Sequence, residues 1–478
     1  MATEKYKHGV YATETATEMT ETVKLKIAQV VIGTAPVHML DNPASAVNKP
    51  VICFDIDDFR SKVGYSDDYQ KYTVCQSAYA SLIDAKVAPL VFINVLDPSK
   101  HFTEVAEKDY PVNDNSITIN DDVIVSTLEI KKEGTPVEAD KYIAEWADGS
   151  LLINFVESVE GSVTVKYNKT APEKVTNTDV IGKWNTETDE RTGAEAIRDI
   201  NPFLGVVPSI LTAPGWSEDE LVGAVLDAKC NNINGSYKAI AISDIDSSKA
   251  KTRAAAIEEK KARAWSANSI AAYPKVQKGE RIIALSSYIA ALIMSLAAGK
   301  DSVTCDSPSN KEMTIDTSVL ADGTPVAYDV PAGNELDGAG IVTVIARNGW
   351  YCWGNNTAAF PGTKDPKDRF IMTRNSFNWM ENDFINTNFK KLDDALNPKM
   401  VEDCISDYNL KLDSYSTNGY LVGGKIFYKA ERNTANTLLA GMFNFNTLLA
   451  GNIPGSVINN EFAYDTDTFV SKILGGAE

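Results

Sequence analysis

The chain has 478 residues, which favours two to four domains, since a domain typically holds roughly 100–200 residues. With 44% hydrophobic and 23% charged residues, its composition is that of a soluble globular protein and excludes wholesale disorder or a fibrous repeat. The 65 Asp and Glu residues outnumber the 46 Lys and Arg residues, and the net charge of −19 disfavours binding of nucleic acid or of an anionic membrane surface by the chain as a whole.

The N-terminal residues and the cysteines indicate a protein that stays in a reducing compartment. Residues 1–22 are polar and rich in Thr and Glu, without the apolar core of a secretory signal. The six cysteines form no CxxC pair, so we expect buried thiols and neither a zinc site nor a disulfide scaffold; they are Cys53, Cys75, Cys230, Cys305, Cys352 and Cys404. Residues 281–300 are the most apolar stretch, but serines interrupt it, and we expect a buried helix with no direct membrane insertion.

The first third of the chain predicts a parallel α/β sheet. Residues 22–34, "TVKLKIAQVVIGT", alternate and then become fully apolar, which predicts a strand that is half exposed and then buried. Helical spacing follows over residues 71–88, and residues 89–97, "PLVFINVLD", form another continuous apolar run. Buried strands that alternate with a helix are typical of a parallel sheet.

The pattern changes from about Pro98 to about Val180. Short alternating runs are separated there by Glu-Gly and Asp-Gly turns, and Val163, Val165 and Tyr167 share one face of such a run. These residues predict a small antiparallel β domain inserted into the α/β unit.

The α/β pattern then resumes. Residues 203–215 and 237–245 are predicted strands, residues 251–265 an exposed helix, and residues 217–230 a helix that begins with a Ser-x-x-Glu capping box at Ser217. Residues 321–340 are rich in Gly, Pro and Asp and predict a surface loop.

The last region begins near Pro361. A helix is predicted over residues 368–396, and strands are predicted for residues 423–431, for both copies of "NTLLAG" at Asn436 and Asn446, and for residues 456–469.

No established catalytic pattern is present. Gly33 stands alone, without the GxGxxG spacing that dinucleotide binding needs, and no GxxxxGK[ST] exists. Only His8, His38 and His101 could serve as a general base, and Ser217 lies in "GWSED", which lacks the second glycine of a nucleophile elbow. No metal-ligand spacing appears, so catalytic, metal and cofactor sites are all predicted to be absent. A hydrolase that uses Ser217 and a carbohydrate-binding surface or adhesin module remain the alternatives.

Several segments together resemble the tail sheath proteins of contractile bacteriophages and of R-type bacteriocins. The resemblance is carried by "HGVYATE", by "VVIGTAPVHMLDNPASAVNKPVICFD", by "GYSDDYQKYTVCQSAYASLIDAKVAPLVFINVLDP" and by "NGYLVGGKIFYKAERNTANTLLAG". It covers most of the chain, whereas the inserted β region matches only in its general type.

The resemblance implies an α/β plus α+β fold, with a subtilisin-like α/β sheath core, an inserted antiparallel β domain, a C-terminal α+β domain and extended N- and C-terminal strands. The implied boundaries are residues 1–22 for the N-terminal extension, 23–97 and 181–355 for the core, 98–180 for the insertion, 356–464 for the C-terminal domain and 465–478 for the C-terminal extension.

The resemblance also implies a non-enzymatic function. A sheath subunit polymerises helically with copies of itself around an inner tail tube protein, meets baseplate and tail terminator proteins, and contracts to drive the tube through a cell envelope. We therefore expect a component of a virion tail or a phage-tail-like particle, made in the bacterial cytoplasm and released by lysis.

In this family the terminal extensions add strands to a neighbouring copy, because an unpaired sheet edge is a template for an extended chain. Composition alone also allows frayed termini.

The predicted hinges are residues 19–24 and 459–467. The predicted assembly residues are Gly9, Val10, Tyr11, Ala12, Thr13, Glu14 and Thr15 in the donated N-terminal strand; Tyr464, Thr466, Thr468, Phe469 and Val470 in the donated C-terminal strand; and Lys425, Ile426, Phe427 and Tyr428 in the acceptor sheet.

Overall fold

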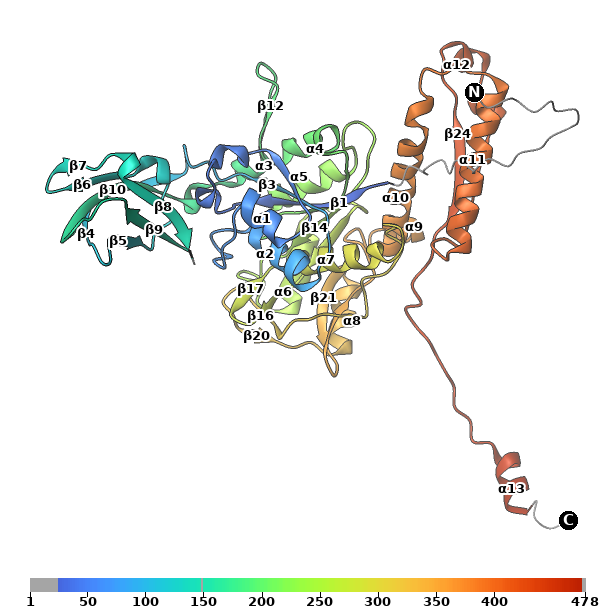
Figure 1. The fold of residues 1–478 in the computed structure, drawn as a ribbon. Helices are drawn as coiled ribbons and strands as arrows, with labels where there is room; N and C mark the ends of the chain where they lie inside the picture. Colours follow the sequence, from blue (N-terminus) through green and yellow to red (C-terminus); the bar gives the residue numbers. More distant parts are fainter. Residues whose placement is uncertain (1–24, 148, 475–478) are drawn as a thin grey trace, which may run out of the picture.

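A computed structural model describes residues 25–147 and 149–474. Three regions follow one another across the molecule (Figure 1): a β-rich unit, a central α/β body, and a pair of long helices with a β-hairpin, from which a tail extends away from the body. The fold is therefore mixed α/β, as predicted.

The body is built on a nine-stranded sheet. Its strands lie in the order β18 (Lys311–Glu312), β22 (Trp350–Trp353), β21 (Ile341–Ala346), β15 (Ser269–Ala272), β14 (Ile240–Asp244), β13 (Val207–Thr212), β1 (Ile27–Gly33), β3 (Leu90–Asn94) and β2 (Pro50–Cys53). From β21 to β3 each neighbouring pair is parallel, whereas β2, β22 and β18 pair antiparallel at the edges. The predicted parallel sheet is confirmed in the structure, and its strands carry the continuous apolar runs of strands that are buried on both faces.

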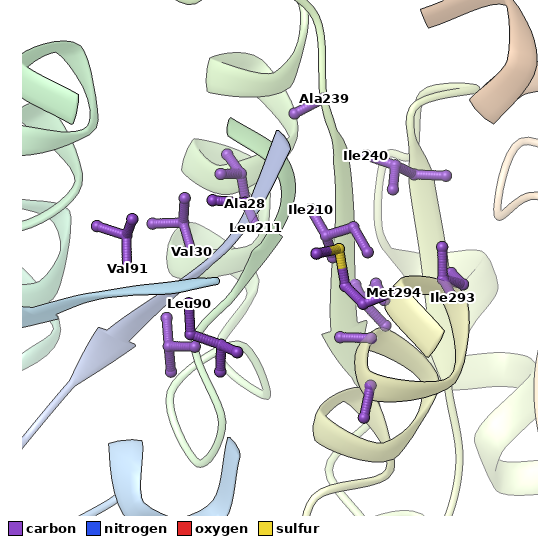
Figure 2. Close-up of a cluster of buried hydrophobic side chains, with 14 of the residues drawn as sticks. Ala28, Val30, Leu90, Val91, Ile210, Leu211, Ala239, Ile240, Ile293 and Met294 are labelled. Atoms are coloured by element: carbon purple, nitrogen blue, oxygen red, sulfur yellow. The ribbon is translucent and has the colours of Figure 1, made fainter. Parts of the chain in front are cut away.

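Helices cover the sheet. They are α1 (Ile56–Lys62), α2 (Val74–Ala78) with a π-helical turn at Tyr79–Asp84, α3 (Asn177–Ile181), α4 (Ile197–Leu204), α5 (Glu220–Cys230), α6 (Arg253–Ala262), α7 (Leu285–Ala298) and α8 (Val330–Gly338). Helix α7 is the predicted buried helix, and Figure 2 shows its Ile293 and Met294 beside Ile210 and Ile240 of the sheet. The structure contains no helix long and apolar enough to cross a bilayer among the residues it describes.

The β-rich unit lies between β3 and α3 in the sequence. One sheet has the order β4 (Phe102–Pro111), β10 (Ser162–Thr170), β6 (Glu129–Lys132) and β7 (Thr135–Pro136), and the other has β5 (Ser116–Ile119), β9 (Ser150–Phe155) and β8 (Tyr142–Ala147). Val163, Val165 and Tyr167 are buried in their shared core, as the alternation predicts. The body also carries a small sheet of β17 (Arg281–Ile283), β16 (Lys275–Lys278), β19 (Thr317–Val319) and β20 (Pro325–Val326), and a protruding hairpin of β11 (Trp184–Asn185) and β12 (Glu190–Arg191).

Two predictions for the body are wrong. Residues 321–340 are not a loop throughout, since α8 occupies Val330–Gly338: Asp329 caps this helix by accepting a hydrogen bond from Ala332 N at 3.0 Å, and Gly333 lets it approach the sheet. A Cβ on Gly333 would lie only 2.6 Å from Ile345 Cγ2. Ser217 does not cap α5, since the cap is Asp219, whose carboxylate accepts hydrogen bonds from Leu221 N and Val222 N.

The C-terminal region begins with α9 (Pro366–Arg369), α10 (Ile371–Asn388) and α11 (Pro398–Thr417). Strand β23 (Gly423–Tyr428) then pairs antiparallel with β24 (Phe445–Ala450), and α12 (Ala435–Leu439) lies in their connection. The first "NTLLAG" is therefore in a helix and not in a strand, because the Thr434 side chain caps α12. The second copy lies in β24, as predicted.

The tail, residues 451–474, departs from the prediction as well. Residues 451–465 have no regular secondary structure, and residues 466–474 form helix α13 (Thr466–Leu474) where a strand was predicted. The physical reason is a helix cap: the Asp465 carboxylate accepts a hydrogen bond from Thr468 N at 2.9 Å and another from the Thr468 hydroxyl. The hydroxyl bond, together with the backbone bond, lowers the pKa of Asp465.

Candidate assembly surface of the C-terminal region

A hydrolase site would have to include Ser217, which lies near the carboxyl ends of the parallel strands. Its Oγ is 3.3 Å from Oδ2 of Asp244 and accepts a hydrogen bond from Asp244 N at 3.1 Å. Asp244 is itself occupied, because Oδ1 accepts the N–H of Ser286 in the first turn of α7 at 3.0 Å. Burial raises the pKa of Asp244. This acid therefore stabilises the start of α7.

No histidine contacts Ser217 within the described residues. His38 is buried against Trp146, with a ring-to-ring distance of 4.9 Å, and His101 Nδ1 accepts a hydrogen bond from Asp97 N at 3.0 Å. His8 lies outside the residues that the structure describes. The described residues also contain no group of three or more His, Cys, Asp or Glu side chains that could hold a metal ion. Among the residues that the structure describes, Ser217 thus has no histidine that could act as its base.

The C-terminal region has a different kind of site, an incompletely paired hairpin. Strands β23 and β24 form a sheet of two strands, so each has an outer edge. Lys425, Ile426, Phe427 and Tyr428, the predicted acceptor residues, all lie in β23. The structure places them together, but it does not leave their outer edge open.

The outer edge of β23 is covered at its centre by Asn409 of α11. The Asn409 side chain accepts a hydrogen bond from Ile426 N at 2.9 Å and donates one to Ile426 O at 3.1 Å. Both backbone groups of a strand residue point to the same edge, so those of Ile426 point away from β24. A side-chain amide here takes the place of a neighbouring strand.

The outer edge of β24 has no neighbouring strand among the described residues. Thr447 lies opposite Ile426 in a pair that exchanges no backbone hydrogen bonds, so its N–H and C=O also point outward. Within the described part of the chain, neither backbone group of Thr447 has a hydrogen-bond partner. An exposed strand edge of this kind can pair with another extended chain.

The hairpin is held firmly to the body by α10 and α11. Ile426 is fully buried, and Tyr408 Oη of α11 donates to Met380 O of α10 at 2.9 Å. Lys411 Nζ lies 2.6 Å from the buried Asp383 Oδ1, and burial raises the pKa of Asp383 despite this ion pair. An assembly force applied to the hairpin would therefore reach the body through two packed helices.

The tail leaves the hairpin at Ala450 (Figure 1), and its apolar side chains are exposed to water. Ile458, Phe462 and Tyr464 share one face of an extended chain, and Ile458 is 93% exposed and Phe462 90% exposed. Apolar groups so fully in water indicate a surface that becomes buried in a larger assembly.

An apolar groove of about 610 Å³ lies at the opposite end of the hairpin. It is formed by the start of α11, the end of β23 and the α12 connection. Its lining residues include Val401, Ile405, Tyr428, Leu438, Leu439 and Phe443. We call this surface the α12 groove.

The predicted assembly residues are thus distributed unevenly. Gly9 to Thr15 lie outside the described residues. Tyr464 lies in the extended part of the tail, and Thr466, Thr468, Phe469 and Val470 lie on α13. Sequence reasoning missed Asn409, Thr447 and the α12 groove. Only the groove left a signal in the sequence, because its Leu438 and Leu439 are an apolar pair in a polar region.

Comparisons with known proteins show what the chain as a whole is similar to. No protein-family model matches the chain. The chain is 24% identical over 336 residues to the tail sheath protein of Escherichia phage P2, and the match covers 68% of this chain and 80% of the phage protein. Its structure is similar to the PVC sheath complex of an extracellular contractile injection system in the contracted state, with a TM-score of 0.54, 14% identity, and coverage of 97% of this chain and 100% of that chain.

The predicted resemblance to contractile tail sheath proteins is confirmed. A further structural match, to a chain of the anti-feeding prophage baseplate in the contracted state, has a TM-score of 0.56 and 12% identity and covers 96% of this chain and 98% of that chain. These structures show that the chain has the fold of sheath proteins, and together with the phage relative they support the prediction of a structural sheath subunit.

Proposed function

We propose that this chain is a structural subunit of a contractile tail sheath and that copies are joined by strand addition at the outer edge of β24. The observation that carries the proposal is the open backbone of Thr447, next to a tail that leaves its own body with its apolar side chains uncovered. When the tail of one copy adds as a strand to β24 of another, main-chain hydrogen bonds would pair the backbone of Thr447. The same contact would bury the apolar side chains of the tail.

The donated segment is the extended part of the tail and not α13. Residues 457–464 have no regular structure and alternate, with Ile458, Phe462 and Tyr464 on one side. Residues 9–15 would supply a second donated strand, as predicted. The hinges would be residues 19–24 and the segment from Asn459 to Asp465, which ends where the cap of α13 begins.

Head-to-tail contacts between identical copies give a ring when the rotation closes and a helix when it does not. Stacked copies would enclose an inner tail tube protein and end at baseplate and tail terminator proteins. The particle would be a virion tail or a phage-tail-like particle, released by lysis. Contraction would slide rigid bodies past one another while the donated strands act as hinges.

The body would serve as a scaffold without chemistry. Its parallel sheet, flanked by helices, supports the proposed subtilisin-like core, and the absence of a histidine at Ser217 within the described residues supports a structural role. A fold does not bring the activity of other proteins that share it.

The test is a proline on the open edge. Thr447→Pro removes an N–H that points outward, so it should leave the β23–β24 pairing intact and block the incoming strand. Thr447→Val keeps the N–H and is the matched control.

By negative-stain electron microscopy, the wild type and Thr447→Val should form tubes or sheath-like polymers, and Thr447→Pro should remain monomeric with an unchanged melting transition. Polymers of normal length from Thr447→Pro would contradict strand addition at β24. A wild-type chain that stays monomeric at high concentration would contradict the sheath function itself.

A further inference from the structure

Helix α13 carries an apolar face that no other described residue of the same copy covers. Phe469, Val470, Ile473 and Leu474 follow the spacing of one helix face, and each is at least half exposed. Thr468, Ser471 and Lys472 lie on the remaining surface. Figure 1 shows this helix at the end of the tail, away from the rest of the chain.

A helix of nine residues needs a partner to be stable. Isolated helices shorter than about 12–15 residues are marginal in water, and in proteins an amphipathic helix is stabilised by packing of its apolar face. The Asp465 cap helps α13 to form, but it buries none of the four apolar side chains. The helix is therefore suited to docking against an apolar surface.

The α12 groove is such a surface. Leu439 is 87% exposed, and Tyr428 and Leu438 also remain accessible to water beside it. Glu402 lines the same groove and can pair with a cation. Lys472 is the cation that α13 carries within its second turn. The two surfaces thus both carry apolar side chains, and Lys472 at the side of α13 has a charge opposite to that of Glu402.

The path of the chain favours docking between copies. The groove lies where β24 begins, beside Phe443, whereas the tail leaves from Ala450 at the far end of β24 and continues away from the groove (Figure 1). Residues 451–465 can span up to roughly 50 Å when extended, which is enough to reach a neighbouring molecule.

We propose that α13 of one copy binds in the α12 groove of a second copy. This inference deepens the proposed function: the tail then holds its neighbour twice, by a donated strand at β24 and by a helix at the other end of the same hairpin. The helix would lock the strand in register, because a strand whose end is fixed cannot slip by a residue pair.

Cysteine cross-linking tests the contact. Two full-length variants, Ile473→Cys and Leu439→Cys, are mixed, assembled and oxidised; the six native cysteines are buried and give little background. The control replaces Ile473→Cys by Thr468→Cys, on the polar side of α13. Each mixture is scored for covalent dimers by non-reducing electrophoresis and for polymers by electron microscopy.

We expect covalent dimers from the Ile473→Cys mixture, in at least tenfold excess over the Thr468→Cys control. Polymers without such dimers would overturn the docking of α13 and leave the sheath function standing. If a chain that carries both Ile473→Cys and Leu439→Cys forms only an internal disulfide, α13 binds its own groove and the proposal is wrong.

Discussion

The central sheet and the C-terminal hairpin differ in how much of their surface is buried within a single copy of the chain. Every residue of β1 is buried, whereas none of the six residues of β24 is. Among the described residues, seven large hydrophobic side chains are exposed before residue 389 and nineteen are exposed after residue 388. Among the described residues, the body thus buries most of its apolar side chains, whereas the C-terminal region leaves many of its apolar side chains exposed.

This contrast indicates that different residues determine the stability of the fold and the assembly of copies. Because the hairpin is fixed to α10 and α11 on one side and open on the other, the same unit can transmit force and still accept a strand. Variants of the body should therefore change folding, and variants of the open surfaces should change polymerisation.

Deletion of residues 455–478 should have the largest effect. It removes the donated strand and α13 together, so we expect complete loss of polymers. The described residues of this segment are almost all exposed, and the free energy of unfolding should change by less than about 0.5 kcal/mol. Pelleting and urea denaturation measure the two quantities. A deletion that unfolds the body, or one that still polymerises, would break the contrast between the regions.

A matched pair of truncations sharpens the contrast. Leu211 is fully buried in β13, and Leu211→Ala should lower the free energy of unfolding by about 2–5 kcal/mol. Ile458→Ala removes a side chain of similar size from the exposed tail and should change stability by less than about 0.5 kcal/mol while slowing polymerisation. Urea denaturation and light scattering compare the two. Equal losses of stability would show that the tail packs on its own body.

His38 should make stability depend on pH at the junction of the body and the β-rich unit. Its ring faces Trp146 and Tyr72, with Asp122 Oδ1 at 3.6 Å and Lys71 beyond that carboxylate. Burial lowers the pKa of His38 from 6.5 to about 4, so between these values the unfolded chain binds a proton that the folded chain does not. The contribution of neutral His38 to the free energy of unfolding is therefore fully present above pH 6.5. It is lost as the pH drops toward 4, which lowers the free energy of unfolding by up to about 3 kcal/mol.

His38→Phe removes this titration and keeps an aromatic ring next to Trp146. Urea denaturation from pH 7 to pH 4.5 measures the difference in unfolding free energy between the wild type and His38→Phe. As the pH falls, the variant should become steadily more stable relative to the wild type. A constant difference would show that protonation of His38 is not coupled to folding.

The sequence was most informative where burial is complete. Continuous apolar runs predicted β1, β3, β13 and β14, and the serine-interrupted run at residues 281–300 predicted the buried helix α7, because such side chains leave few alternatives to a core. The capped helix α8 was missed because Gly and Pro usually mark loops, yet here Gly333 permits close packing and Asp329 caps the first turn.

The site was harder to predict. The hexapeptide "NTLLAG" forms a helix at Asn436 and a strand at Asn446, so local sequence alone does not decide its structure. Asn409 is 17 residues from Ile426, and its role on the strand edge depends on how α11 packs. The open edge at Thr447 follows from pairing register, which no single sequence displays.

The central claim is most directly tested by cryo-electron microscopy of the assembled particle, at a resolution that traces the backbone around β24. Our account predicts an added strand from another copy, hydrogen-bonded to Thr447 along the outer edge of β24. A hairpin that remains two-stranded in the particle, with each tail folded back on its own body, would contradict it.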